Sequence, residues 1–226
     1  GLHRFCVEPS LNGSFGWTPA RKESLDEAIL RPVNKPFDAE GGLRVVDGNV
    51  GRAIVKVSAV DEEHYAIEAP AKVFATQAEF TEAFNAGELE QDFVAVLPWQ
   101  GPKANGMPEL HKLTPYLGVL QNRGFKVALL TDGRMSGASG KVLAAIQVTP
   151  EAVDDGVIGR IKDGDIVKVD AVEGVLTVSA DEDPAQREPV TRDLSESHHG
   201  MGRDLFTAFR QSVSGAESGG TIFMWD

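Results

Sequence analysis

Residues 93–109 read Phe-Val-Ala-Val-Leu-Pro-Trp-Gln-Gly-Pro-Lys-Ala-Asn-Gly-Met-Pro-Glu. The first five form an apolar run bounded by turn residues, which predicts a buried strand followed by a Gly- and Pro-rich loop. A second run, Phe125-Lys-Val-Ala-Leu-Leu-Thr131, predicts another strand, and it too leads into a glycine-rich loop. Residues 110–124 lie between the two loops and predict a helix that Pro115 bends or splits and Gly124 ends. Strands alternating with helices in this way indicate a mixed α/β domain.

Shorter elements are predicted on both sides of this segment. Thr76 and Glu79 have capping-box spacing, so a helix should run from there to about Gly87. Turn signals and apolar runs predict the remaining elements: strands at 43–46 and 53–58, a small helix at 142–146, a β-hairpin over 165–178 and an amphipathic helix over 202–210.

The first part of the chain has a different character. Residues 1–40 are polar and rich in proline, and we expect them to form an irregular arm with one short helix, which begins near Ser24 and ends before Pro32. Residues 41–226 should form the main domain. The chain opens with Gly rather than Met, which is typical of a piece of a longer protein.

Composition excludes several classes of function. The 226 residues carry a formal net charge of −12, with 42% hydrophobic and 25% charged residues, as in ordinary soluble domains. Nucleic-acid binding requires a cationic face, which this balance does not favour. No apolar stretch approaches the ~20 residues of a membrane span, and no secretory signal is evident, so we expect a cytoplasmic protein without membrane contact. The single cysteine, Cys6, cannot supply a thiolate cluster.

The loop over residues 100–109 places Lys103, Asn105 and Glu109 between a strand and a helix, where ligand-binding groups gather in α/β proteins. Glu109 can be interpreted in two ways. It is either a carboxylate in the first turn of the helix, which favours the positive end of the helix dipole, or a residue that binds metal or handles protons.

The loop over residues 131–141 reads Thr-Asp-Gly-Arg-Met-Ser-Gly-Ala-Ser-Gly-Lys. It lacks the first glycine and the final Ser/Thr of a nucleotide phosphate loop, but its backbone N–H groups could hold an anion or a developing oxyanion. Ser136 lies mid-loop, beside Gly137. A purely structural turn is an equally open interpretation.

Three stretches of the sequence together resemble the C-terminal part of the dihydroxy-acid and 6-phosphogluconate dehydratase family: Gly41 to Ala53, Phe93 to Leu110 and Leu130 to Lys141. Their motifs are most similar to those of the phosphogluconate branch. The resemblance implies dehydration of 6-phospho-D-gluconate to 2-dehydro-3-deoxy-6-phospho-D-gluconate, a step of the Entner-Doudoroff pathway. It also implies a β-barrel-like swivelling domain, similar to that of aconitase-like enzymes and flanked by helices.

The resemblance assigns roles to particular residues. Ser136 corresponds to the proposed base of the family, and Glu109 to a carboxylate that binds a divalent metal such as Mg²⁺. The substrate is expected to contact four residues of these loops, namely Lys103, Asn105, Arg134 and Lys141.

The resemblance further implies a partner domain and a cofactor. In this family an iron-sulfur cluster, expected to be 4Fe-4S, is held by cysteines of the N-terminal domain, so this chain alone should bind no cluster and be inactive. The full-length protein should be a homodimer. Two alternatives stay open: a domain acting on a dihydroxy acid or another sugar acid, and a non-catalytic anion-binding module of the same fold.

Overall fold

The computed structural model describes residues 7–11, 13–21, 23–135 and 140–223. The chain divides into two compact units, Gly1–Gly42 and Leu43–Asp226. Among the described residues, no helix has the length and apolar character needed to cross a membrane.

The first unit contains a hairpin that the sequence did not reveal. Strand β1 (Val7–Leu11) pairs antiparallel with β2 (Phe15–Pro19). The helix predicted after Ser24 is wrong, because the chain instead forms a turn in which Ile29 and Leu30 donate to the carbonyl of Asp26. Leu25 and Ile29 are largely exposed, so burial contributes little to offset the cost of starting a helix so close to Pro32.

The second unit is a closed barrel flanked by helices, which confirms the predicted mixed α/β, barrel-like class. Its strand order is β10-β3-β4-β8-β7-β6-β5-β9, and β5 to β8 form a parallel run within it. The strands are β3 (Leu43–Gly48), β4 (Gly51–Lys56), β5 (Ala66–Val73), β6 (Phe93–Leu97), β7 (Val127–Thr131), β8 (Leu143–Thr149), β9 (Ile166–Asp170) and β10 (Val175–Ser179). The helices are α1 (Gln77–Asn85), α2 (Pro102–Asn105), α3 (Leu113–Asn122) and α4 (Thr207–Ser212).

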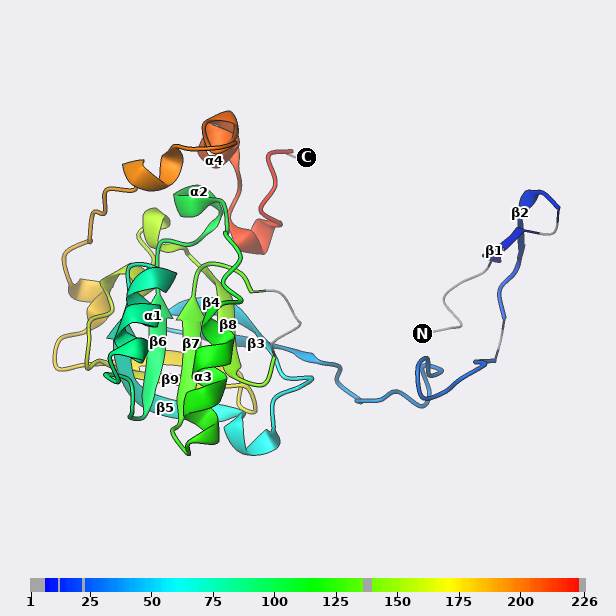
Figure 1. Ribbon diagram of the computed structural model, residues 1–226, viewed down its shortest axis with the longest axis horizontal. Helices are drawn as coiled ribbons and strands as arrows, with labels where there is room; N and C mark the ends of the chain where they lie inside the picture. The colour runs from blue at the N-terminus through cyan, green and yellow to red at the C-terminus, as the bar shows by residue number, and fades with distance from the viewer. Residues whose placement is uncertain (1–6, 12, 22, 136–139, 224–226) are drawn as a thin grey trace. The chain divides into compact units, whose positions relative to one another are not determined.

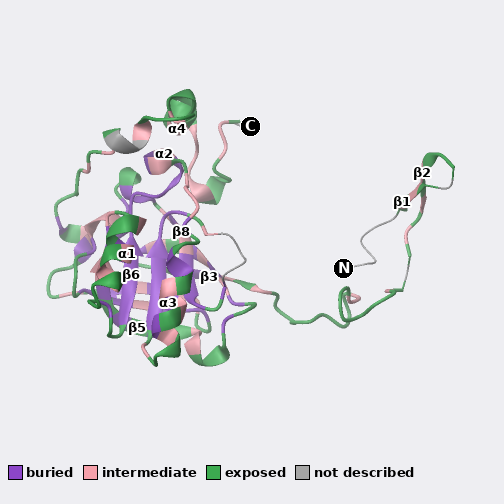
Figure 2. Ribbon diagram, viewed as in Figure 1, coloured by how far each residue is buried: buried purple, intermediate pink, exposed green. Residues whose placement is uncertain are grey.

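Strands β6 and β7 are buried on both faces (Figure 2), and their residues are apolar except for Thr131 at the end of β7. Val94 and Val96 contribute to the core inside the barrel, whereas Phe93, Ala95 and Leu97 contribute to a second core with α1 and α3, which cross these strands in Figure 1. The second core also contains Phe80, Leu113, Leu117 and Leu120 from the two helices. A two-sided strand of this kind reads as a continuous apolar run.

Several predicted elements are present. The hairpins β3–β4 and β9–β10 pair antiparallel as expected, and Thr76 caps α1 by accepting a hydrogen bond from the backbone N–H of Glu79 at 3.1 Å. Helix α3 begins at Leu113, so Pro115 lies in its first turn, where its missing N–H breaks no helical hydrogen bond.

Two predicted helices differ from the structure. Residues 143–149 form β8, because Leu143 and Ala145 fill the barrel core while Ala144 packs in the second core, and this alternation closes the barrel between β4 and β7. The helix predicted over 202–210 is a short 3₁₀ turn, Asp204–Phe206, followed by α4.

A buried ion pair ties the segment after β10 to the barrel. The Arg187 guanidinium donates to both carboxylate oxygens of Asp165, with Nη2 to Oδ1 at 2.8 Å, and also to the Arg160 carbonyl at 3.0 Å. Burial by itself would raise the pKa of Asp165, but the hydrogen bonds and positive charge of Arg187 outweigh it, so the pKa lies below its ordinary value.

We predict that Arg187→Met lowers the free energy of unfolding by about 3 kcal/mol at neutral pH, because it leaves the Asp165 carboxylate buried without its partner. The lowered pKa means that the pair contributes fully above the ordinary pKa of a carboxyl group, and that this contribution disappears as the pH falls through the lowered value. Urea unfolding at several pH values should therefore show the two proteins converging in acid. A constant difference down to the most acidic pH would contradict this, and Arg123→Met, which removes an exposed pair with Glu90, should change little at any pH.

Candidate functional site

Both glycine-rich loops leave the same edge of the barrel. Strands β6 and β7 are parallel neighbours, with Phe93 beside Val127 and Leu97 beside Thr131. The loops that follow them, beginning at Pro98 and at Asp132, therefore start side by side at the carboxyl ends of the strands (Figure 1), the usual place for a ligand site in parallel sheets.

The carboxylate of Asp132 joins three segments at this edge. It is fully buried, and it accepts backbone hydrogen bonds from Gln100 at 2.8 Å, from Ala152 at 2.9 Å and from Trp99 at 3.1 Å. Burial raises the pKa of Asp132, although these N–H groups oppose the shift. The hydrogen bonds also hold Trp99 at a φ of 67°, a left-handed conformation that is strained for a residue other than glycine.

A second carboxylate, Glu151, sets the start of α2. Its two oxygens accept from the backbone N–H groups of Lys103 and Ala104, at 3.1 and 3.2 Å. Burial is the main reason that the pKa of Glu151 is raised. Gly101 is needed beside it, because a Cβ there would collide with the Glu151 carboxylate. The sequence predicts that Lys103 contacts the substrate. In the structure its ammonium group pairs with the Asp154 carboxylate at 2.6 Å.

The two loops converge at Glu109 and Arg134. Arg134 Nη1 donates to Glu109 Oε2 at 3.0 Å, and Arg134 Nε donates to the Met107 carbonyl at 2.8 Å. The backbones of Glu109 and Arg134 also form an isolated parallel bridge, and His111 Nδ1 lies 3.9 Å from Glu109 Oε1. Glu109 is not in the first turn of a helix, because α3 begins only at Leu113.

The structure does not bring all the predicted residues together. Ser136 lies outside the described residues. Lys141 is exposed and precedes β8, whose first residue Leu143 pairs with Ala128 near the start of β7. Lys141 is therefore at the opposite end of these parallel strands from Arg134.

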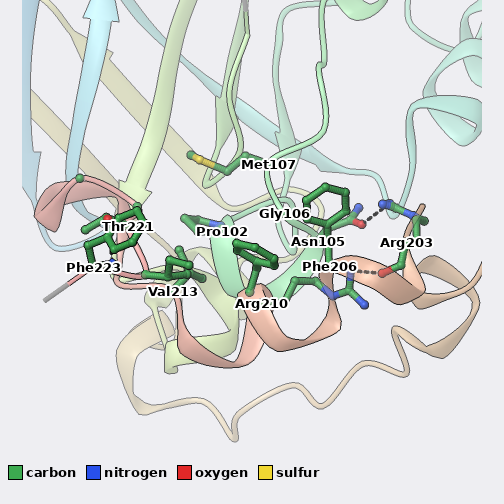
Figure 3. Close-up of a pocket in the computed structure, with 14 residues that line it drawn as sticks. Pro102, Asn105, Gly106, Met107, Arg203, Phe206, Arg210, Val213, Thr221 and Phe223 are labelled. Atoms are coloured by element: carbon green, nitrogen blue, oxygen red, sulfur yellow. Dashed lines mark hydrogen bonds between the residues drawn. The ribbon is translucent and has the colours of Figure 1, made fainter. Parts of the chain in front are cut away.

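Asn105 borders a groove of about 570 Å³ that lies between α2 and residues 203–223 (Figure 3). Its side-chain Oδ1 accepts from Arg203 Nη2 at 2.6 Å, and its Nδ2 donates to Gln100 Oε1 at 3.1 Å. The groove also contains Arg210 and several aromatic side chains. Sequence reasoning missed Arg203 and Arg210, although both fall within the helix predicted over 202–210.

Residues 28–220 match the family described as "Dihydroxy-acid/6-phosphogluconate dehydratase C-terminal". The chain belongs to this family. Phosphogluconate dehydratase from Pseudomonas aeruginosa is 56% identical over 224 residues, covering 99% of this chain and 37% of that protein. Its Escherichia coli K12 counterpart is 53% identical over 223 residues, covering 98% of this chain and 37% of that protein.

A relative from the other branch of the family is more distant. Dihydroxy-acid dehydratase from Halothermothrix orenii is 37% identical over 177 residues, covering 76% of this chain and 31% of that protein. The chain spans 37% of the length of these two phosphogluconate dehydratases.

One carboxylate, that of Glu109, lies at the meeting point of the two loops and could bind a divalent metal. Within the described ranges, no three His, Cys, Asp or Glu side chains cluster in a way that could hold a metal ion. Mg²⁺ commonly takes only one or two carboxylates and completes its shell with water and substrate oxygens, so a single carboxylate at Glu109 is compatible with such a site, although Glu109 Oε2 already accepts from Arg134 Nη1. The described residues do not fit an iron-sulfur cluster, because the only cysteine of the chain, Cys6, lies outside them.

We predict that Glu151→Ala lowers the free energy of unfolding by about 1–2 kcal/mol, because two N–H groups at the start of α2 lose their acceptor. Hydrogen exchange should accelerate at Lys103 and Ala104, and the thermal midpoint should fall. The control Glu82→Ala changes an exposed carboxylate on α1 and should leave both unchanged. Equal exchange at Lys103 and Ala104 in wild type and Glu151→Ala would show that Glu151 does not hold α2.

Proposed function

We propose that this chain is the C-terminal domain of a dehydratase that converts 6-phospho-D-gluconate to 2-dehydro-3-deoxy-6-phospho-D-gluconate and water. The observation that carries the proposal is the pattern of identity. Relatives that cover almost the whole chain at 56% and 53% identity are phosphogluconate dehydratases, whereas the dihydroxy-acid dehydratase is 37% identical over a shorter stretch.

The reaction requires a base and a way to release hydroxide. The C2–H bond breaks, its electron pair forms the C2–C3 double bond, and the C3–O bond breaks as the hydroxyl leaves and takes up a proton to become water. The resulting enol then becomes the 2-keto product by protonation at C3. The C2 proton is weakly acidic, so the charge that develops beside the carboxylate must be stabilised.

In this proposal the side-chain oxygen of Ser136 receives the C2 proton as an alkoxide and so becomes the neutral hydroxyl. Arg134, two residues earlier in the same loop, is a positioning residue, because its contacts with Glu109 and with the Met107 carbonyl fix the two loops against each other. Glu109 is proposed as a ligand of Mg²⁺, which when bound would neutralise charge developing on the substrate carboxylate.

Further groups are assigned to the rest of the protein. We place the ligands of a 4Fe-4S cluster in another domain, since this chain contributes one cysteine, and we assign departure of the C3 hydroxyl to groups of that domain. The barrel acts as a swivelling domain that closes over the substrate, as in aconitase-like enzymes. The full-length protein is a cytoplasmic homodimer, and this domain alone is inactive.

We predict that Ser136→Ala lowers kcat of the anaerobically prepared full-length enzyme on 6-phosphogluconate by about 10²–10⁴-fold, the contribution typical of a general base. Glu109→Gln should lower kcat as well, because it removes the negative charge that would hold the metal. Ser179→Ala, at the exposed end of β10, should leave turnover unchanged.

Two results would contradict the proposal. Near-normal turnover by Ser136→Ala with an intact fold would make this serine a structural turn residue. Efficient dehydration of a 2,3-dihydroxy acid without a phosphate group, and none of 6-phosphogluconate, would move the protein to the other branch of the family.

A further inference from the structure

The groove beside α2 contains two guanidinium groups whose hydrogen-bond partners, among the residues that the structure describes, are all neutral. Arg203 Nη2 donates to the side-chain oxygen of Asn105, and Arg210 donates to the Arg203 carbonyl at 3.1 Å (Figure 3). Arg210 also donates to Thr207 Oγ1 at 3.1 Å. Among the described residues, no carboxylate lies within ion-pair distance of either arginine, and none of those lining the groove is Asp or Glu. The positive charge of this groove is therefore not neutralised by the described part of the chain.

This arrangement contrasts with the rest of the chain, which has a formal net charge of −12. Several other arginines bind carboxylates: Arg21 with Glu8, Arg52 with Asp47, Arg123 with Glu90, Arg134 with Glu109, Arg160 with Asp155 and Arg187 with Asp165. Two unneutralised arginines at one groove in an acidic molecule indicate a site for an external anion.

The groove adjoins the meeting point of the two loops. Met107 lines the groove, and its carbonyl accepts the hydrogen bond from Arg134 Nε at 2.8 Å. Asn105, the partner of Arg203, is two residues earlier, so the Cα atoms of Asn105 and Met107 are at most about 7 Å apart. A phosphorylated six-carbon acid can therefore reach from the guanidinium groups toward Glu109 and Arg134.

Apolar side chains form much of the wall around the two guanidinium groups. Phe206 and Phe209 line the groove, with ring centroids 5.4 Å apart, together with Val213 and Phe223. The three phenylalanines are 44% to 67% exposed, so the groove is open to a ligand from solvent. The planar guanidinium forms two parallel hydrogen bonds with phosphate oxygens, a geometry that lysine cannot provide. A volume of about 570 Å³ is within the ordinary range for a small-molecule site.

We propose that this groove binds the phosphate end of the substrate, with Arg203 and Arg210 as its ligands and Asn105 positioning Arg203. The inference rests on the proposed function and adds the feature that separates a phosphorylated sugar acid from an unphosphorylated dihydroxy acid. Because the phosphate lies away from the reacting carbons, these arginines contribute to binding of the ground state and the transition state alike.

Steady-state kinetics of the full-length enzyme test this directly. Arg203→Gln and Arg210→Gln should each raise KM for 6-phosphogluconate by about 10–100-fold, the size of a lost charge-assisted hydrogen bond, while kcat stays within a few-fold of wild type. Arg203→Lys should restore part of the loss. The matched control Arg123→Gln, at an exposed pair on the end of α3, should leave KM unchanged.

A second variant keeps the contact with Arg203 and adds a negative charge to the groove. Asn105→Asp would pair with Arg203 and preserve the position of the guanidinium, but its negative charge would repel phosphate, and it would lose the hydrogen bond that Asn105 Nδ2 donates to Gln100 Oε1. It should therefore raise KM for 6-phosphogluconate and weaken competitive inhibition by inorganic phosphate, in a protein whose thermal unfolding shows that it is folded. Unchanged KM and unchanged inhibition in this variant and in both glutamine variants would overturn the proposal.

Calorimetric titration with inorganic phosphate separates this inference from the proposed function. If the wild-type enzyme binds phosphate and the Arg203→Gln/Arg210→Gln double variant does not, the groove is an anion site even if 6-phosphogluconate is not dehydrated. If the wild type dehydrates 6-phosphogluconate and the folded double variant keeps its KM and phosphate affinity, the groove proposal fails and the proposed function stands.

Discussion

The buried carboxylate of Asp132 is the contact on which the site depends. Its three backbone hydrogen bonds, to Trp99, Gln100 and Ala152, connect the residues that follow β6 and β7 with those that follow β8. Burial raises the pKa of this carboxyl group, so keeping it ionised costs free energy that the N–H groups offset only in part. The loop bearing Glu109 and the loop bearing Arg134 can meet in one geometry because both begin from this fixed point.

The same constraint orders the groove. The backbone N–H of Gln100 donates a hydrogen bond to Asp132, and the side-chain oxygen of Gln100 accepts one from the side-chain amide of Asn105. The side-chain oxygen of Asn105 in turn accepts a hydrogen bond from Arg203. Glu151 adds a second fixed point at the start of α2. A chain of hydrogen bonds therefore runs from the strand ends of the barrel to the guanidinium groups, which makes the anion site an extension of the same architecture.

The sequence predicted those parts of the fold whose signal is local. The apolar runs of β6 and β7, the hairpins β3–β4 and β9–β10 and the cap at Thr76 follow from composition and spacing alone. The sequence predicts a helix where β8 lies, because alanine favours helices. The extended conformation is stabilised by pairing with β4 and β7, which closes the barrel. The helix predicted after Ser24 is absent because Leu25 and Ile29 are largely exposed, so burial contributes little to stabilising it.

For the site, the sequence predicted that the two loops carry the chemistry, and the Glu109–Arg134 contact brings them together. It could not predict that Lys103 pairs with Asp154 or that Lys141 lies at the far end of the strands, because both depend on how the chain returns across the barrel. The sequence does not single out Asp132, since an aspartate before a glycine gives no sign of the backbone groups it will meet.

The most direct test is backbone hydrogen exchange in the Asp132→Asn variant. The amide would lose the charge that binds three N–H groups and would place a donor against one of them, so exchange should accelerate at Trp99, Gln100 and Ala152 and extend to Leu110, which donates to the Arg134 carbonyl. Asp170→Asn, at another buried aspartate that accepts two backbone N–H groups, should affect only the β9–β10 turn. Unchanged exchange at Trp99, Gln100 and Leu110 in Asp132→Asn would show that the two loops are held together without it.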